Sequence, residues 1–188
     1  MSGSAKETIL TVARQTAQAH GYGGLSYRDL AAEVGIKAAS IYHHFASKAD
    51  LGAAVARRYW EDTAAELDAM LAEIGDPIRC LQRYPELFRR SLADGNRLCL
   101  CSFMSAEYAD LPEVVQVEAQ AFADVHIAWL TRVLILSGKV NPENSEARAR
   151  AIFAAVSGAQ LFARSRSDIA QFDNLIESYR AAGLLPTA

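Results

Sequence analysis

The stretch SYRDLAAEVGIKAASIYHHFASKADL, residues 26–51, decides the fold. Its apolar residues recur at helical spacing in two short blocks. They are Leu30, Ala31 and Val34 in the first block and Ile36, Ile41 and Phe45 in the second. Gly35 separates the blocks, and glycine readily adopts the left-handed backbone of a tight turn. The stretch therefore predicts two short helices folded against each other, which is the geometry of a helix-turn-helix.

The outward face of the second helix is predicted to carry mostly short side chains. The residues on this face are Lys37, Ala38, Ala39, Ser40 and His43. Short side chains would let the backbone lie near the base edges of a DNA major groove, and Lys37 and His43 can donate hydrogen bonds. Many three-helix folds share this spacing without binding DNA, so the spacing by itself leaves the function open.

A longer set of residues matches a known protein family. It comprises Leu25–Ala31, Gly35–Ile36, Ser40–Phe45 and Ser47–Leu51. Together these residues resemble the N-terminal domain of the TetR/AcrR family of transcriptional regulators. The most specific part is Tyr-x-His-Phe followed by Ser-Lys and an acidic-leucine pair, here Asp50-Leu51. Lys37 departs from the family, which often has serine or threonine there to cap the recognition helix, and lysine cannot cap in that way.

The resemblance implies further DNA contacts. Besides the outward face, the predicted DNA-binding set comprises Ser26, Tyr27, Arg28, Tyr42, His44 and Lys48. Ser26 and Tyr27 begin a helix, where backbone N–H groups can bind a phosphate. Tyr42 and Lys48 are expected to contact backbone phosphates, and Arg28 a phosphate or a groove edge. The alternatives are packing or solvated roles, above all for His44.

Charge is distributed unevenly along the chain. Residues 1–58 hold seven Lys and Arg against four Asp and Glu, a net charge of +3, whereas the whole chain carries −3. A basic N-terminal part and an acidic remainder suit a DNA-binding protein with a separate sensing domain. Chance variation in a few charges is the alternative.

The remaining pattern predicts an all-α fold of about nine helices, with no stretch that alternates long enough for a strand. The first helix should start at Ser4, which forms a capping-box spacing with Glu7, and Ser26 and Ser47 should cap later helices. The segments predicted beyond a long helix from Ser47 to about Leu71 are 77–93, 97–107, 112–137, 143–166 and 168–182. We expect a DNA-binding domain over residues 1–50 and a ligand-binding and dimerisation domain over residues 51–188.

The last two predicted helices are candidates for a dimer interface. Small residues recur in 146–166, and the stretch 158–164, GAQLFAR, resembles the corresponding family segment. The resemblance implies that these helices pair with their copies in a four-helix interface. An internal pair of core helices is the alternative. One recognition helix contacts few base pairs, so operator binding also favours a homodimer.

The middle helices contain apolar and aromatic residues that would line a cavity for a small effector. They are Phe88, Leu100, Phe103, Met104, Tyr108, Phe122, His126, Trp129 and Phe153. Each could instead belong to the core. The set predicts a hydrophobic or aromatic effector of moderate size.

Other classes of protein have little support in the sequence. Cys80, Cys99 and Cys101 are an odd, small set, which favours buried reduced thiols over disulfides or a redox or metal site. No nucleophile elbow, phosphate loop or His-Glu metal pattern occurs, so we predict no catalytic residues, no metal and no cofactor. The lack of a long uninterrupted apolar run predicts a cytoplasmic protein without membrane contact. A helical small-molecule-binding protein that does not bind operator DNA is the alternative function.

Overall fold

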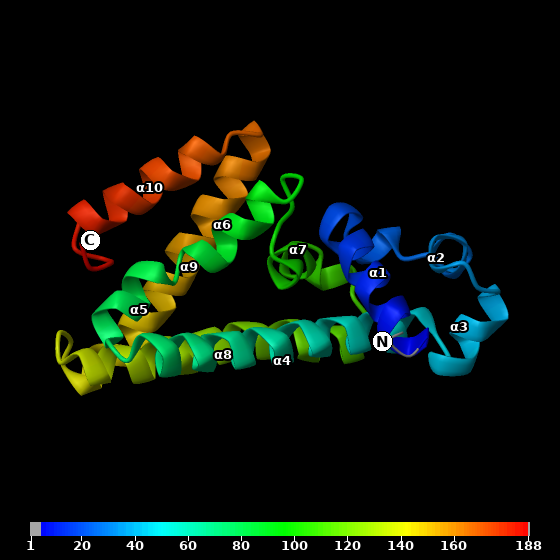
Figure 1. Cartoon of the computed structure of the whole chain (residues 1–188), viewed down its shortest axis with the longest axis horizontal. Helices are drawn as coiled ribbons and strands as arrows, with labels where there is room; N and C mark the ends of the chain where they lie inside the picture. Colours follow the sequence, from blue (N-terminus) through cyan, green and yellow to red (C-terminus); the bar gives the residue numbers. More distant parts are fainter. Residues whose placement is uncertain (1–4, 188) are drawn as a thin grey trace. The chain divides into compact units, whose positions relative to one another are not determined.

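The computed structural model describes residues 5–187 and shows only helices and turns in that range (Figure 1). The all-α prediction is confirmed. The α-helices are α1 (Ala5–His20), α2 (Tyr27–Val34), α3 (Ala38–His44), α4 (Lys48–Ile74), α5 (Pro77–Arg83), α6 (Glu86–Ala93), α7 (Leu100–Ala106), α8 (Glu113–Ser137), α9 (Pro142–Arg166) and α10 (Ile169–Ala181). Two 3-10 turns, η1 (Tyr22–Gly24) and η2 (Tyr108–Asp110), complete the described fold.

The described residues form ten α-helices, in line with the prediction of about nine, and segment 77–93 forms two of them. α5 ends at Arg83 and α6 begins at Glu86, with Pro85 between them. Proline has no N–H to donate and its ring crowds the preceding turn, so it favours a break there. The predicted start at Ser4 lies outside the described residues.

The chain forms two compact units. One, here called the N-terminal unit, consists of the residues up to Asp62 together with Leu100–Phe122. The other, the C-terminal unit, consists of Thr63–Cys99 and the residues from Ala123 onward. α4 and α8 each contribute residues to both units.

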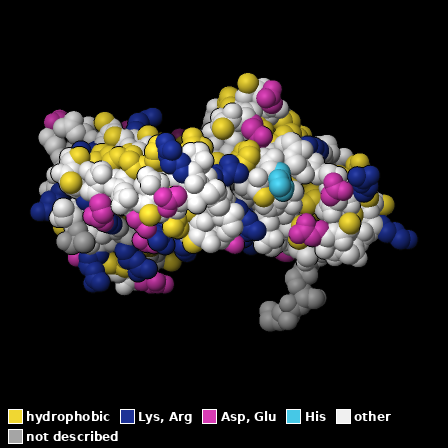
Figure 2. Space-filling view, turned by 90° about the horizontal axis from the view of Figure 1, so that it is seen from above, with side chains coloured by type: hydrophobic (Ala, Val, Ile, Leu, Met, Phe, Trp, Pro, Cys, Tyr) yellow, Lys and Arg dark blue, Asp and Glu magenta, His cyan; other side chains and the backbone are white. Residues whose placement is uncertain are grey.

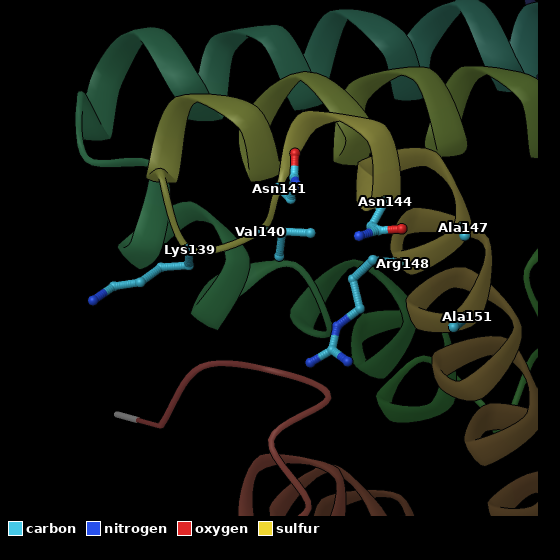
Figure 3. Close-up of a pocket in the computed structure, with 7 residues that line it drawn as sticks. All are labelled: Lys139, Val140, Asn141, Asn144, Ala147, Arg148 and Ala151. Carbon is cyan, nitrogen blue, oxygen red and sulfur yellow. The ribbon is translucent and has the colours of Figure 1, made fainter.

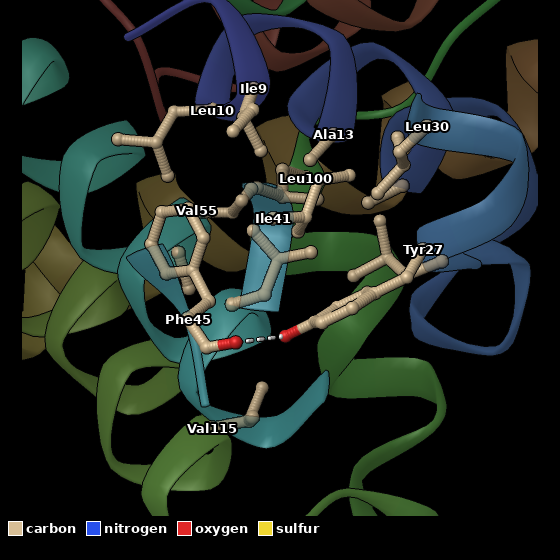
Figure 4. Packing of buried hydrophobic residues seen from close by; sticks show 14 of the residues in the cluster. Ile9, Leu10, Ala13, Tyr27, Leu30, Ile41, Phe45, Val55, Leu100 and Val115 are labelled. Atoms are coloured by element: carbon tan, nitrogen blue, oxygen red, sulfur yellow. Dashed lines mark hydrogen bonds between the residues drawn. The ribbon is translucent and has the colours of Figure 1, made fainter. Parts of the chain in front are cut away.

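The core of the N-terminal unit joins the predicted helix-turn-helix to α1, α4, α7 and α8 (Figure 4). Its buried residues include Ile9, Ala13, Leu30, Ile41, Phe45, Val55, Leu100 and Val115. Burial of such side chains contributes about 1.5–3 kcal/mol each for the larger aliphatic and aromatic ones. α2 and α3 are therefore held by a shared core rather than by their own short length.

The helix boundaries in this unit follow the predicted capping residues. The Ser26 hydroxyl accepts a hydrogen bond from the Asp29 N–H at 3.4 Å, and the Ser47 hydroxyl accepts one from the Asp50 N–H at 3.1 Å. Gly35 adopts the left-handed conformation, with φ of 76°, and ends α2. The turn between the two short helices thus uses a backbone conformation that side chains other than glycine rarely adopt.

In the C-terminal unit, α9 packs against α6 and α10. The Gln160 side chain, fully buried, accepts from the Cys99 N–H at 3.1 Å and donates to the Phe88 carbonyl at 2.7 Å. An ion pair between Arg89 and Asp173, at 2.8 Å, joins α6 to α10. The three cysteine side chains are buried, as predicted.

α8 is long and apolar enough to cross a membrane by length and composition, reaching a mean hydropathy of 1.2. Core helices of soluble proteins pass the same test. Here Glu118 of α8 is buried and forms an ion pair with Arg57 of α4. The helix therefore belongs to the protein interior along this part of its length.

Candidate nucleic-acid interface

α3 separates its residues cleanly into a buried and an exposed face. Ile41 is fully buried and Phe45, which follows the helix, is nearly so, whereas Tyr42 is 58% exposed. His43 and His44 are also exposed. The helix therefore presents one side to solvent while the other anchors it in the core, as a recognition helix requires.

The predicted outward face is placed as follows. Lys37 and Ala39 are exposed, Ser40 is half-buried, and Ala38 is half-buried against the core. Lys37 occupies the N-cap position of α3 without a side-chain capping bond. The departure from the family pattern noted in the sequence therefore leaves its ammonium group available to solvent rather than to the helix.

Tyr27 links the two short helices. Its hydroxyl donates a hydrogen bond to the Phe45 carbonyl at 3.0 Å (Figure 4), and its ring packs edge-on against the Tyr42 ring at 4.6 Å between centroids. Burial, with the neighbouring Asp50 carboxylate and the phenols of Tyr42 and Tyr22, raises the pKa of Tyr27 to about 12. The hydroxyl thus stays protonated and holds the end of α3, so only the backbone of Tyr27 is left for a phosphate.

The N-terminus of α2 holds two more predicted residues. Ser26 uses its hydroxyl as the helix cap, and the Arg28 side chain is almost fully exposed, with Nε at 3.4 Å from the Asp29 carboxylate. A pair this exposed contributes little to stability. Arg28 is therefore able to exchange this partner for a phosphate.

Lys48 has partners within the protein. Its ammonium donates to the Gly23 carbonyl at 3.0 Å and lies 4.8 Å from the centre of the Tyr22 ring. These contacts fix the start of α4 against η1. An ammonium group has three donors, so one bond to Gly23 leaves two for another acceptor.

Two carboxylates that the sequence analysis did not single out join the end of α7 to η1, and α8 to α4. Glu107, just after α7, accepts from the Tyr22 N–H at 2.9 Å. Glu118 accepts from Arg57 and, at 2.8 Å, from the Trp60 indole N–H. Burial alone would raise the pKa of Glu118, but the hydrogen bonds from Arg57 and Trp60 and the Arg57 charge outweigh it and lower the pKa. Neither residue belongs to a sequence motif, so only their spatial partners identify them.

The nine predicted effector residues divide between the two units. The N-terminal unit contains Leu100, Phe103, Met104, Tyr108 and Phe122, and the C-terminal unit contains Phe88, His126, Trp129 and Phe153. Leu100 and Met104 fill the core of the N-terminal unit. Phe122 stacks on Tyr59, and the Tyr108 hydroxyl accepts from Gln120 at 2.6 Å.

In the C-terminal unit, Phe88, His126 and Trp129 contact one residue that sequence reasoning missed, Tyr84. Its hydroxyl lies 2.8 Å from Nδ1 of His126, and its ring stacks on Trp129. Burial lowers the pKa of His126 to about 3 and raises that of Tyr84 well above its ordinary value. His126 is therefore neutral, and it shares a buried hydrogen bond with the Tyr84 hydroxyl. Phe88 and Phe153 pack on the His126 ring, with centroids 5.4 Å and 5.2 Å away.

Trp129 also lines an open groove of about 370 Å³ between α4 and α8. Leu67, Val125 and Ala128 supply apolar walls, and Asp68 and Arg132 form an ion pair at its rim. The volume of the groove is that of a small-molecule site. The Trp129 ring forms part of its apolar surface, and the Asp68–Arg132 pair supplies its charged groups.

The fold and this interface define a class of protein, the all-helical regulators that bind DNA through a helix-turn-helix. Residues 9–55 match the family described as bacterial regulatory proteins, tetR family. A TetR-family transcriptional regulator from Agrobacterium tumefaciens is 33% identical, with 93% of this chain and 95% of that chain covered and a TM-score of 0.86. A TetR regulator from Legionella pneumophila is 30% identical over 97% and 98% of the two chains, with a TM-score of 0.89. A comparison with curated proteins found no match.

The chain therefore belongs to the TetR family. It is a soluble DNA-binding transcriptional regulator and not an enzyme. The fold is also shared with the reduced form of E. coli NemR, at 22% identity and a TM-score of 0.84.

Proposed function

We propose that this regulator is a cytoplasmic repressor that binds its operator as a homodimer and is released by a small hydrophobic or aromatic effector. The observation that carries the DNA-binding part is the division of α3, whose Ile41 is buried while Tyr42, His43 and His44 are exposed. This division leaves an exposed face free to enter a major groove without disturbing the core.

The proposed DNA contacts are the sequence-predicted set, with the roles refined by the geometry. Tyr42, Lys48 and Arg28 bind phosphates, and Lys37 and His43 lie toward the base edges. Residues 1–50 serve as the DNA-binding domain and residues 51–188 serve ligand binding and dimerisation. This functional division differs from the packing division, in which α7 and the first part of α8 belong with the N-terminal unit.

The test of this proposal is an electrophoretic mobility shift with DNA from upstream of the chain's own gene. Specific binding at nanomolar protein, competed by the same DNA but not by unrelated DNA, is the expected result. Equal competition by unrelated DNA would favour the alternative, a helical small-molecule-binding protein without operator binding. A transcription assay with the shifted fragment then separates repression from activation.

The dimer is proposed to form through α9 and α10. Ala159, in the small-residue stretch, is fully buried inside the protomer, so part of α9 serves internal packing. Leu161 and Phe162 remain 53% and 39% exposed, and Arg166 stacks on Phe162 at 4.3 Å. Figure 2, which looks onto the side that carries α10, shows hydrophobic side chains gathered in a band among charged ones. Exposed large apolar residues on these helices are what a homodimer interface would cover.

The effector is proposed to bind the C-terminal unit around Trp129. Its groove is largely apolar, and the Trp129 ring stacks on Tyr84, which belongs to a buried aromatic cluster with His126, Phe88 and Phe153. Aromatic compounds that release the operator in the mobility shift would identify the chemical class. Trp129→Ala should weaken release and leave DNA binding without the compound nearly intact; loss of both would place Trp129 in the structural core only.

Release follows from the geometry that operator binding requires. Two recognition helices must lie about 34–36 Å apart to enter successive major grooves. α4 runs unbroken from Lys48, at the helix-turn-helix, to Ile74, past the groove residue Leu67. An effector that binds about a hundredfold more tightly to a state with another spacing contributes about 2.7 kcal/mol per subunit toward release.

A further inference from the structure

A second cavity lies in the C-terminal unit, away from the Trp129 groove. It measures about 490 Å³ and is bounded by α5, the end of α8, α9, α10 and the segment 183–187. Its apolar walls include Ile78, Leu81, Leu134, Val140, Leu184 and Leu185. It shares no lining residue with the groove that contains Trp129.

The polar side of this cavity is cationic. Lys139, Arg148 and Arg180 line it, and its described lining contains no Asp or Glu. A neighbouring hollow of about 540 Å³ shares Lys139, Val140 and Arg148 (Figure 3). In Figure 3 the Arg148 side chain extends from α9 toward the C-terminal segment, whereas the Lys139 side chain extends sideways and is exposed. Arg148 and Arg180 are therefore the two cationic side chains that we consider as ligand contacts in the cavity.

Both guanidinium groups are partly used by the protein. Arg148 donates to the Gly183 carbonyl, and Arg180 donates to the Gln82 carbonyl at 3.0 Å and pairs with Glu177. Among the described residues, the Nε of Arg148 and the Nε of Arg180 are buried and have no acceptor. A buried donor without an acceptor is unfavourable, and more so when it is charged. Both arginines line the cavity and have donors to spare, which favours a ligand that supplies acceptor oxygens.

We propose that this cavity binds an organic anion with an aliphatic chain, such as a medium-chain carboxylate. The carboxylate accepts from the two arginines and the chain lies against the leucine-rich walls. An inorganic anion would leave those walls exposed to water, and an uncharged alcohol would bring no negative charge to the guanidinium groups. The proposal does not depend on operator binding or on the effector site around Trp129.

The test follows the Nε–Hε signals of the arginines by ¹⁵N NMR during titration with octanoate. Arg148→Gln and Arg180→Gln identify the two signals. Saturable shifts of both signals are expected with octanoate. Acetate, inorganic phosphate and 1-octanol should bind at least about tenfold more weakly, because each lacks either the chain or the charge.

A matched pair of variants places the ligand in the cavity. Val140 lies in the turn between α8 and α9 and lines both hollows. Val140→Asp adds a like charge and should weaken octanoate binding at least about tenfold, whereas Val140→Asn, of the same size, should have a much smaller effect. Thermal unfolding checks that both variants fold.

Three results would overturn the proposal. Equal binding of acetate or phosphate would make this a simple anion site, and equal binding of 1-octanol would make it an apolar groove. Octanoate binding that Val140→Asp leaves unchanged would place the ligand elsewhere. Any of these leaves the operator-binding proposal unaffected, since its mobility-shift test does not involve this cavity.

Discussion

The Tyr27 hydroxyl donates a hydrogen bond to the Phe45 carbonyl at 3.0 Å, joining the start of α2 to the end of α3. The bond is buried, and it fixes the recognition helix at the end where its aromatic residues emerge. Tyr42, whose ring packs against Tyr27, has the opposite environment and is largely exposed. Two tyrosines in contact thus have separate predicted roles, one in folding and one in DNA binding.

Substitution of these two tyrosines should separate stability from DNA affinity. Tyr27→Phe leaves a buried carbonyl without its donor and should lower the free energy of unfolding by about 1–3 kcal/mol, measured by urea denaturation. Tyr42→Phe should change stability by less than about 0.5 kcal/mol but weaken operator binding. Equal loss of stability in both variants would contradict the assignment.

Lys48 should account for part of the salt dependence of DNA binding. A dimer places two copies on phosphates, so Lys48→Ala should lower the slope of log affinity against log salt by about two units and weaken binding equally on every sequence. Lys139→Ala, an exposed lysine of the C-terminal unit, is the control and should leave the slope unchanged. A slope that Lys48→Ala does not alter would confine Lys48 to its contacts with Gly23 and Tyr22.

Leu161→Glu should disrupt the proposed dimer. The side chain is exposed in the protomer, so the substitution should not disturb the core, but a two-fold interface would bury the new charge twice. Sedimentation should show a monomer, and operator binding should be lost with it. The matched control is Ile135→Glu, which replaces a comparably exposed apolar residue on α8, 45% against 53% for Leu161. A Leu161→Glu protein that stays dimeric would move the interface away from this face of α9.

His126 should make the protein less stable in mild acid. Its pKa in the folded state, about 3, lies below the ordinary value of 6.5, so the unfolded chain binds more protons between these values. Stability is therefore fully present above pH 6.5 and falls as the pH is lowered, by about 2 kcal/mol at pH 5. The free energy of unfolding, measured between pH 7 and pH 5, tests this. Most carboxylates titrate below this range and therefore contribute little to the change.

The variant His126→Asn provides the control for that measurement. Its amide can still form a hydrogen bond with the Tyr84 hydroxyl, in either direction, but it does not titrate. Stability of this variant should depend much less on pH between 7 and 5. An unchanged pH dependence would show that another group is responsible.

Some of this architecture follows from local sequence alone. Gly35 specifies a left-handed turn because other side chains crowd that conformation, and Ser26 and Ser47 begin helices because their hydroxyls accept from the backbone N–H groups that a helix start leaves unpaired. Residues a few positions apart determine these features, so the two short helices and the turn between them could be predicted. The exposed face of α3 could be predicted only in part, because Ala38 packs half-buried against the core.

The partners of the functional side chains depended on tertiary structure instead. The contact of Lys48 with Gly23, the Glu118 pair with Arg57 and the bond from Tyr84 to His126 join residues 25, 61 and 42 positions apart. No helical period relates such positions, so the sequence could not show which predicted residue has an internal partner. In the same way, the spacing of apolar residues predicts which residues are buried, but it does not identify the helix that each one packs against. Ala159 lies inside the protomer while Leu161, two positions on, faces solvent, because packing against α6 and α10 uses only one side of α9.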